Sequence, residues 1–140
     1  MPVLDTDVLT IIQRRAEPGY TRLVNRLNAE PGIILWTTVI SFEEQLRGWL
    51  AYVKSARITQ LAAAYQKLLE LNEDFSTRPV LPFDTRATAQ LEALIHERIR
   101  RGIMDLKIAA VALAHSETLI SKNLKDFRKV RGLLVEDWTI

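Results

Sequence analysis

Acidic side chains follow several apolar segments of the chain, and their types and positions suit a divalent metal ion. Asp5 ends the first apolar segment, Glu44 lies in the first turn of the helix after the second, and Asp105 begins a strongly apolar helix. Asn123 and Asp126 follow the fourth segment. Oxygen ligands of this kind, with no cysteine and two histidines in the chain, favour Mg²⁺ or Mn²⁺ over zinc. Such an ion suits phosphodiester hydrolysis, because it can activate a water and neutralise charge on a phosphoryl group.

These side chains can form one site only if the fold brings them to one place. In a parallel sheet, the carboxyl ends of the strands and the first turns of the following helices lie at the same edge. Two carboxylates about 4 Å apart repel by roughly 4 kcal/mol at an effective dielectric constant of about 20. Several carboxylates at that edge therefore require protonation or a bound cation.

Each of these residues also has an ordinary structural explanation. Asp5 could cap the helix that follows it, and Glu44 could form a capping box with Ser41. Asp105 would complement the dipole of its helix, and the remaining two could be turn residues. The shared edge is what favours a site over a set of separate caps. Structural roles are expected for Asp84, His96 and His115.

The elements expected to position the acids are strands that alternate with helices. Strands are predicted at 2–5, 33–37, 78–84, 117–121 and 133–136, the third at an edge because of its prolines. Helices are predicted before 15, before 31–32, over 41–71 with a break near 54–55, over 85–101 and over 105–115. This alternation predicts an α/β fold, a three-layer α/β/α sandwich with a mostly parallel sheet of about five strands. We expect one domain over 1–140, with a helical hairpin at about 43–72.

The composition excludes several classes of protein. The chain has 140 residues, a net charge of +2, 48% hydrophobic residues and no cysteine, so disulfides and thiolate metal sites are excluded. No signal peptide is expected, and the longest apolar run, 108–114, is too short to span a bilayer. We expect a cytoplasmic protein that does not bind a membrane. The charge permits a polyanionic partner without requiring one.

Five segments in order resemble the PIN-domain ribonucleases, and within that family the VapC toxins of type II toxin–antitoxin pairs. They are Leu4-Asp5-Thr6-Asp7-Val8-Leu9, Glu44-Gln45-Leu46-Arg47-Gly48, Leu81-Pro82-Phe83-Asp84, Asp105-Leu106-Lys107-Ile108-Ala109-Ala110 and Ser121-Lys122-Asn123-Leu124-Lys125-Asp126-Phe127. The resemblance implies a PIN-like fold and a metal-dependent endoribonuclease that hydrolyses RNA phosphodiester bonds. It also implies a homodimer that is silenced by a cognate antitoxin, whose C-terminal segment lies across the active groove.

The resemblance also assigns the acids, with Asp5, Glu44 and Asp105 as the catalytic residues and ligands of Mg²⁺ or Mn²⁺. It favours Glu44 over Glu43 because Glu44 stands four residues before Gly48. The fourth acidic place of the family is Asn123 here, and Asp126 is close enough in sequence to share that role. Ser121 and Asp7 are expected to support the site, Asp7 as a helix cap or as an outer residue.

Basic residues near these segments are the candidates for binding RNA. Lys122 and Lys125 flank the loop of Asn123, and Arg14 and Arg15 close the first helix. Cations around an acidic centre could hold the flanking phosphates of a nucleic acid. The ordinary alternative is a solvated surface.

Two other functions remain possible from the sequence. A phosphatase of the haloacid-dehalogenase type would use Asp5 as its nucleophile and Asp7 as its general acid. Against it, Leu9 stands where a Thr or Val is expected, and no pair of acids follows the fourth strand. A phospho-receiver module would use Asp5, Asp7 and Asp84. Against that, the chain has two helices between the third and fourth strands where that fold has one.

Overall fold

The fold is built on five short parallel strands. The structure is a computed structural model that describes residues 1–99 and 102–140. The strands are β1 (Val3–Leu4), β2 (Thr37–Thr38), β3 (Val80–Leu81), β4 (Leu119–Ile120) and β5 (Val135–Glu136). One sheet has the order β1-β4-β5 and the other pairs β2 with β3. A parallel bridge between Val3 and Trp36 joins them, so the strands follow the order β3-β2-β1-β4-β5.

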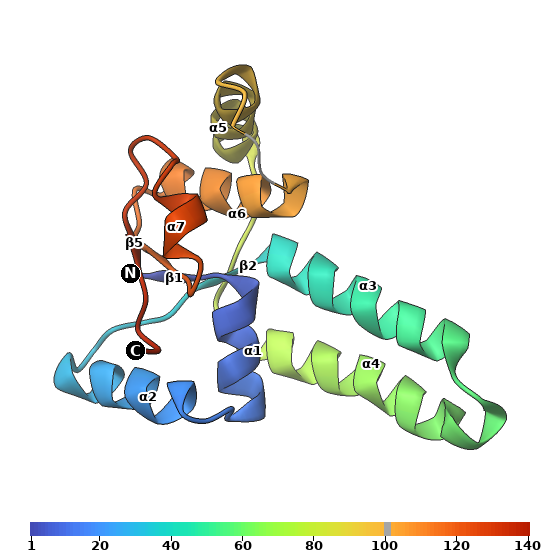
Figure 1. Cartoon of the computed structure of the whole chain (residues 1–140). Coiled ribbons are helices and arrows are strands. Elements are labelled where there is room, and N and C mark those ends of the chain that lie inside the picture. The colour runs from blue at the N-terminus through green and yellow to red at the C-terminus, as the bar shows by residue number, and fades with distance from the viewer. Residues whose placement is uncertain (100–101) are drawn as a thin grey trace.

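Helices cover both faces of the strands, which confirms the expected three-layer arrangement. The helices are α1 (Thr6–Arg14), α2 (Gly19–Ala29), α3 (Val39–Ser55), α4 (Leu61–Ser76), α5 (Thr85–His96), α6 (Ile103–Ala114) and α7 (Leu124–Phe127), with a short 3₁₀ turn, η1 (Ile58–Gln60), between α3 and α4. Figure 1 shows α5, α6 and α7 on one side of the strands, and α1 and α2 on the other. The helices α3 and α4 pack side by side and project away as a long hairpin.

The strand residues alternate between two cores, as the pleat of a strand requires. Val3 and Leu119 face the helices α5 and α6, whereas Leu4 and Ile120 face α1 and α2. The helix α6 is the central one, because five consecutive residues, 108–112, are fully buried. Its almost entirely apolar sequence accounts for this burial, because a helix that is apolar on all sides is stable only inside the protein.

Several predicted boundaries are wrong. Each strand has two residues, and of the predicted strand at 33–37 only Thr37 lies in β2, while Trp36 makes the single bridge to Val3. The strand β3 is short and lies at the edge, flanked by Pro79 and Pro82, which have no N–H to donate. The hairpin is longer than expected and extends over 39–76.

Two helix ends also differ from the prediction. The helix α3 begins at Val39, two residues before Ser41, and its cap is Thr38, whose side chain accepts from the Ser41 N–H. The proposed capping box of Ser41 and Glu44 is therefore wrong. The helix α5 ends at His96, well before the predicted end at 101, and residues 100–101 lie outside the described residues. In the described parts of the chain, no helix is both long and apolar enough to cross a bilayer.

Candidate active site

Asp5 lies where β1 ends and α1 begins, and it is almost fully buried, with 5% of its surface exposed. Its Oδ1 accepts from the Thr6 N–H (2.8 Å), and its Oδ2 accepts from the Ser121 hydroxyl (2.8 Å). Burial raises the pKa of Asp5 to about 6; the hydrogen bonds from Ser121 and Thr6 lower it, and the charges of Asp7 and Asp105 raise it further. Asp5 thus caps α1, and its ionised form is disfavoured by burial and by the neighbouring acids.

Glu44 lies in the second turn of α3, not in the predicted first turn, because the helix begins at Val39; its side chain is half-buried. Its Oε1 accepts from the Thr6 hydroxyl at 2.7 Å. Burial raises the pKa of Glu44, and repulsion from Asp105, Asp7 and Glu43 adds to this, although the Thr6 hydrogen bond opposes it. Glu43 differs from Glu44, because it pairs with Arg47 at 2.6 Å on an exposed part of α3. The side chain that faces the β1–α1 corner is therefore Glu44.

Asp105 brings the third carboxylate, from the first turn of α6, where it is half-buried. Its charge raises the pKa of both Asp5 and Glu44, after the larger effect of burial in each case. The structure therefore places Asp5, Glu44 and Asp105 in one electrostatic neighbourhood; we call these three residues the acidic centre. Among the described residues, no three acid or histidine side chains are grouped tightly enough to hold a metal ion as they stand.

The loop after β4 supports Asp5 through Ser121. The hydroxyl of Ser121, which is fully buried, donates to Asp5 and accepts from the Asn123 N–H (2.9 Å). The Asn123 amide donates to Asp126 Oδ2 at 2.9 Å. Asn123 and Asp126 are thus hydrogen-bonded through their side chains. The backbone N–H of Asn123 is linked to Asp5 through the Ser121 hydroxyl.

The other predicted residues divide between the site and the remaining surface. Asp7 is exposed in the first turn of α1, so the cap of this helix is Asp5 and not Asp7. Lys122 and Lys125 are exposed on either side of Asn123, whereas Arg14 and Arg15 lie at the far end of α1, roughly 13 Å along the helix from Asp5. Lys122 thus follows Ser121 and Lys125 precedes Asp126, whereas the two arginines lie at the opposite end of α1 from Asp5.

Two hydroxyl residues at the site are absent from the sequence prediction. Thr6 bonds Glu44, and its Oγ1 also lies 2.8 Å from Ser41 Oγ. A hydroxyl between two acids, as in Asp5-Thr6-Asp7, was a possible signal for Thr6. The spacing of Ser41 and Glu44 indicates a helix cap, so the sequence does not reveal that Ser41 lies beside Thr6.

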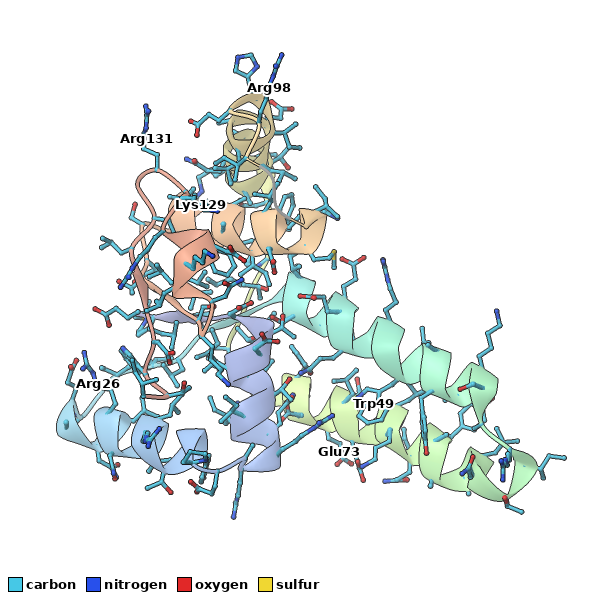
Figure 2. All side chains as sticks on the ribbon, in the orientation of Figure 1. Arg26, Trp49, Glu73, Arg98, Lys129 and Arg131 are labelled. Atoms are coloured by element: carbon cyan, nitrogen blue, oxygen red, sulfur yellow. The ribbon has the colours of Figure 1, made fainter. Side chains whose placement is uncertain are left out.

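A groove of about 750 Å³ lies between α1, α3 and α4, and Arg14 at the end of α1 is among the residues that line it. Gln13 and Gln45 cross it with two amide hydrogen bonds (2.9 and 2.7 Å), and Gln45 also donates to Thr10 (3.3 Å). Figure 2 shows Trp49 of α3 between the two helices of the hairpin, and the Lys67 ammonium lies 5.6 Å from the centre of its ring. The groove is therefore lined by both aromatic side chains and side chains that can form hydrogen bonds.

Two curated relatives from Rickettsia felis are similar to this chain. One, Ribonuclease VapC2, is 29% identical over 77 residues, which are 52% of this chain and 58% of the relative. The other, Ribonuclease VapC1, is 35% identical over 60 residues, which are 40% of this chain and 45% of the relative. The chain thus spans about half the length of the curated relatives that it matches.

Solved structures share the fold over nearly the whole chain. VapBC-1 from nontypeable Haemophilus influenzae gives a TM-score of 0.74 at 21% identity, covering 99% of this chain and 98% of that chain. DNA-bound VapBC from Salmonella typhimurium gives 0.73 at 23% identity, covering 98% and 97%. VapBC-5 from Mycobacterium tuberculosis gives 0.62 at 26% identity, covering 99% and 98%.

The family model described as "PIN domain" matches residues 3–133, which include every residue of the acidic centre. The resemblance seen in the five sequence segments is thereby confirmed, and the chain belongs to the PIN domain family.

Proposed function

We propose that this protein is a Mg²⁺- or Mn²⁺-dependent endoribonuclease, the toxin of a type II toxin–antitoxin pair. The observation that carries the proposal is the acidic centre, in which the charge of Asp105 raises the pKa of Asp5 and Glu44 beyond the effect of burial. Acids that repel one another at the carboxyl edge of a sheet favour the binding of a cation. Membership of the PIN family and the ribonuclease relatives support RNA as the substrate.

The donor set fits a hard divalent cation. Asp5, Glu44 and Asp105 would hold it, and the amide oxygen of Asn123 or the carboxylate of Asp126 would complete the set. When bound, the cation supplies an activated water and neutralises charge on the scissile phosphate. Ser121 orients Asp5 and favours its ionised form, because its hydroxyl donates to Oδ2. The acids do not form a complete set of ligands as they stand among the described residues, so at least one of these side chains must rotate when the cation binds.

The surface beside the acidic centre has the charge expected of an RNA-binding face. Residues 121–133 contain five of the 19 Lys and Arg residues and one of the 17 Asp and Glu residues. Phe127 and Val130 point into the core, which leaves the cations of this segment exposed. We call these exposed cations the basic ridge: Lys122, Lys125, Arg128, Lys129 and Arg131. Figure 2 shows Arg131 projecting outward from the loop after α7.

Cations elsewhere on the protein are more often paired with acids. Arg26, Arg47, Lys67, Arg78 and Arg86 all form ion pairs, whereas no member of the basic ridge does so within the described residues. Ridge charges without carboxylate partners remain available to phosphates. The ridge begins at Lys122, the residue next to Ser121, and would therefore hold RNA beside the acidic centre.

We further propose a cognate antitoxin that binds in the groove between α1, α3 and α4, and a homodimeric toxin. VapBC complexes among the solved structures support a partner protein of this kind. The groove offers Trp49, Tyr52 and the Gln13–Gln45 pair to an extended or helical segment. A chain without cysteine suits the reducing cytoplasm, where such a pair would act.

The two alternative functions have less support. Membership of the PIN family argues against both a haloacid-dehalogenase phosphatase and a phospho-receiver. Asp84, the residue that a receiver would phosphorylate, caps α5 by accepting from the Ala87 N–H at 3.0 Å. That role accounts for Asp84 without any chemistry.

The proposal is tested by incubating single-stranded RNA with the purified chain in Mn²⁺, in Mg²⁺ and in EDTA. We expect cleavage with either metal and none in EDTA, and Asp5→Asn should abolish it. Asp137→Asn is a matched control, because Asp137 accepts hydrogen bonds from Thr139 near the C-terminus and belongs to no proposed site. Cleavage by the Asp5→Asn protein at the wild-type rate would contradict the proposal.

A further inference from the structure

Thr6 holds two acids of the acidic centre through two different groups. Its backbone N–H donates to Asp5 Oδ1 at 2.8 Å, and its hydroxyl donates to Glu44 Oε1 at 2.7 Å. Asp5 belongs to the β1–α1 corner, whereas Glu44 belongs to α3. Thr6 is thus a direct hydrogen-bonded link between the two elements that carry these carboxylates.

The hydroxyl protons in this cluster have one consistent direction. An ionised Glu44 can only accept, so the single hydroxyl proton of Thr6 points to Glu44. Ser41 Oγ lies 2.8 Å from Thr6 Oγ1 and must then donate to it. Ser41 is fully buried, and its backbone N–H donates to the Thr38 hydroxyl oxygen at 3.1 Å. The order of donation is therefore Ser41 to Thr6 to Glu44, and hydrogen bonds in such a series strengthen one another.

Glu44 needs such a restraint because its neighbours repel it. The charges of Asp105, Asp7 and Glu43 all act against its ionised form. A glutamate side chain has several rotatable bonds and would turn away from these charges toward water. The Thr6 hydroxyl holds Oε1 and leaves the second oxygen of Glu44 open to a cation.

We propose that Thr6 and Ser41 are positioning residues, whose two hydroxyls in series hold the Glu44 carboxylate in place for a divalent cation at the acidic centre. The inference rests on the metal centre of the proposed function, and it does not depend on RNA as the substrate. Neither hydroxyl has to contact the cation, because each acts through Glu44. The pair also gives Ser41 a role in place of the helix cap that the sequence suggested.

The test is calorimetric titration of Mn²⁺ into the full chain in the absence of RNA. Thr6→Val removes the hydroxyl with little change of shape, and we expect about tenfold weaker binding or more, as for other residues that orient metal ligands. Ser41→Ala should also weaken binding, because it removes the donor to Thr6. Thr6→Ser keeps the hydroxyl and should bind Mn²⁺ close to the wild-type affinity.

Thr10→Val is the matched control. It makes the same substitution one turn later in α1, where the hydroxyl donates to the Thr6 carbonyl (3.0 Å) and accepts from Gln45 (3.3 Å). Since no carboxylate accepts from Thr10 in the described chain, its loss should leave the Mn²⁺ affinity unchanged.

Three results would overturn the inference: wild-type Mn²⁺ affinity in Thr6→Val, an equal loss in Thr6→Ser and Thr6→Val, or no Mn²⁺ binding by the wild type. If circular dichroism shows that Thr6→Val is unfolded, Ser41→Ala decides, with weaker binding supporting the inference and unchanged binding overturning it. RNA cleavage is measured separately. A chain whose Mn²⁺ affinity depends on these two hydroxyls but that cuts no RNA would refute the proposed function and keep this inference.

Discussion

The Ser121 hydroxyl donates to Asp5 Oδ2 at 2.8 Å and joins the ends of β4 and β1 across 116 positions of sequence. Both residues are buried, so this bond is shielded from water. Hydrogen bonds to a charged group contribute about 1.5–3 kcal/mol, and this one favours the ionised form of Asp5. It therefore opposes the burial that raises the pKa of Asp5 to about 6.

Ser121→Ala should raise the pKa of Asp5 further, because burial then acts without this opposing bond. A cation binds the ionised form, so Mn²⁺ affinity should fall more at about pH 6 than at about pH 8. Calorimetric titration at the two pH values measures this difference. Ser76→Ala is the control, because Ser76 is exposed on α4 and donates to the Glu73 carbonyl (2.7 Å). A pH-independent loss in Ser121→Ala would argue against this role.

Asp5→Asn should stabilise the metal-free protein at neutral and higher pH. The folded-state pKa of Asp5, about 6, lies above its ordinary value of 3.8, so the folded state binds the proton more tightly than the unfolded state. Stability of the wild type therefore falls as pH rises from about 4 to 6, and the full loss, at most about 3 kcal/mol, persists above pH 6. Urea unfolding of both proteins in EDTA, at about pH 4 and about pH 8, measures the effect. A stabilisation that is equal at both values would contradict it.

Removing charge from the basic ridge should weaken RNA binding in a salt-dependent way. For the double variant Arg128→Ala, Lys129→Ala, the slope of log affinity against log salt should decrease by about 0.7 for each cation that contacts a phosphate of single-stranded RNA. Binding is measured in EDTA, so that cleavage does not interfere. The matched control is Lys54→Ala with Arg57→Ala, two exposed cations at the tip of the hairpin. Equal slopes for the ridge variant and the wild type would exclude the ridge as an RNA contact.

The basic ridge depends on the burial of Phe127, which anchors α7. Phe127 has 1% of its surface exposed and packs in the core shared with α5 and α6. Phe127→Ala should lower the free energy of unfolding by about 3–5 kcal/mol, the usual range for a buried aromatic residue. Leu134→Ala should have little effect, because 67% of the surface of Leu134 is exposed. Chemical denaturation of both variants measures the difference, and similar losses would mean that Phe127 is not an anchor.

The sequence was sufficient to predict the order of strands and helices, apart from the short helix α7, and the acids at their ends. An apolar segment that is followed by an acidic or amide residue indicates the end of a strand or the first turn of a helix. Asp5, Asp105 and Asn123 could therefore be placed from their sequence neighbours alone. Strand lengths could not be predicted, because a two-residue strand and a longer apolar segment differ only in their hydrogen-bonding partners. The segment before Thr37 is an example, since its single bridge, at Trp36, depends on where Val3 lies.

The supporting hydroxyls were harder to predict than the acids. Ser41 and Glu44 have the spacing of a capping box. However, Thr38 caps α3, and the Ser41 hydroxyl contacts Thr6 instead. That contact joins residues 35 positions apart, so no local pattern could reveal it. Side-chain contacts between distant elements are set by the packing of α1 against α3, which the sequence does not give directly.

The most direct test of the proposed metal-dependent ribonuclease is the rate at which Asp105→Asn cleaves single-stranded RNA in Mn²⁺. Asp105 is the acid that α6 brings to Asp5 and Glu44, and its substitution preserves shape while removing charge. We expect a loss of at least about a hundredfold, comparable to the loss of a major electrostatic contribution to catalysis, with RNA binding in EDTA retained. Asp84→Asn, at the cap of α5, should cleave at the wild-type rate. Wild-type cleavage by Asp105→Asn would contradict the assignment of the acidic centre as the active site.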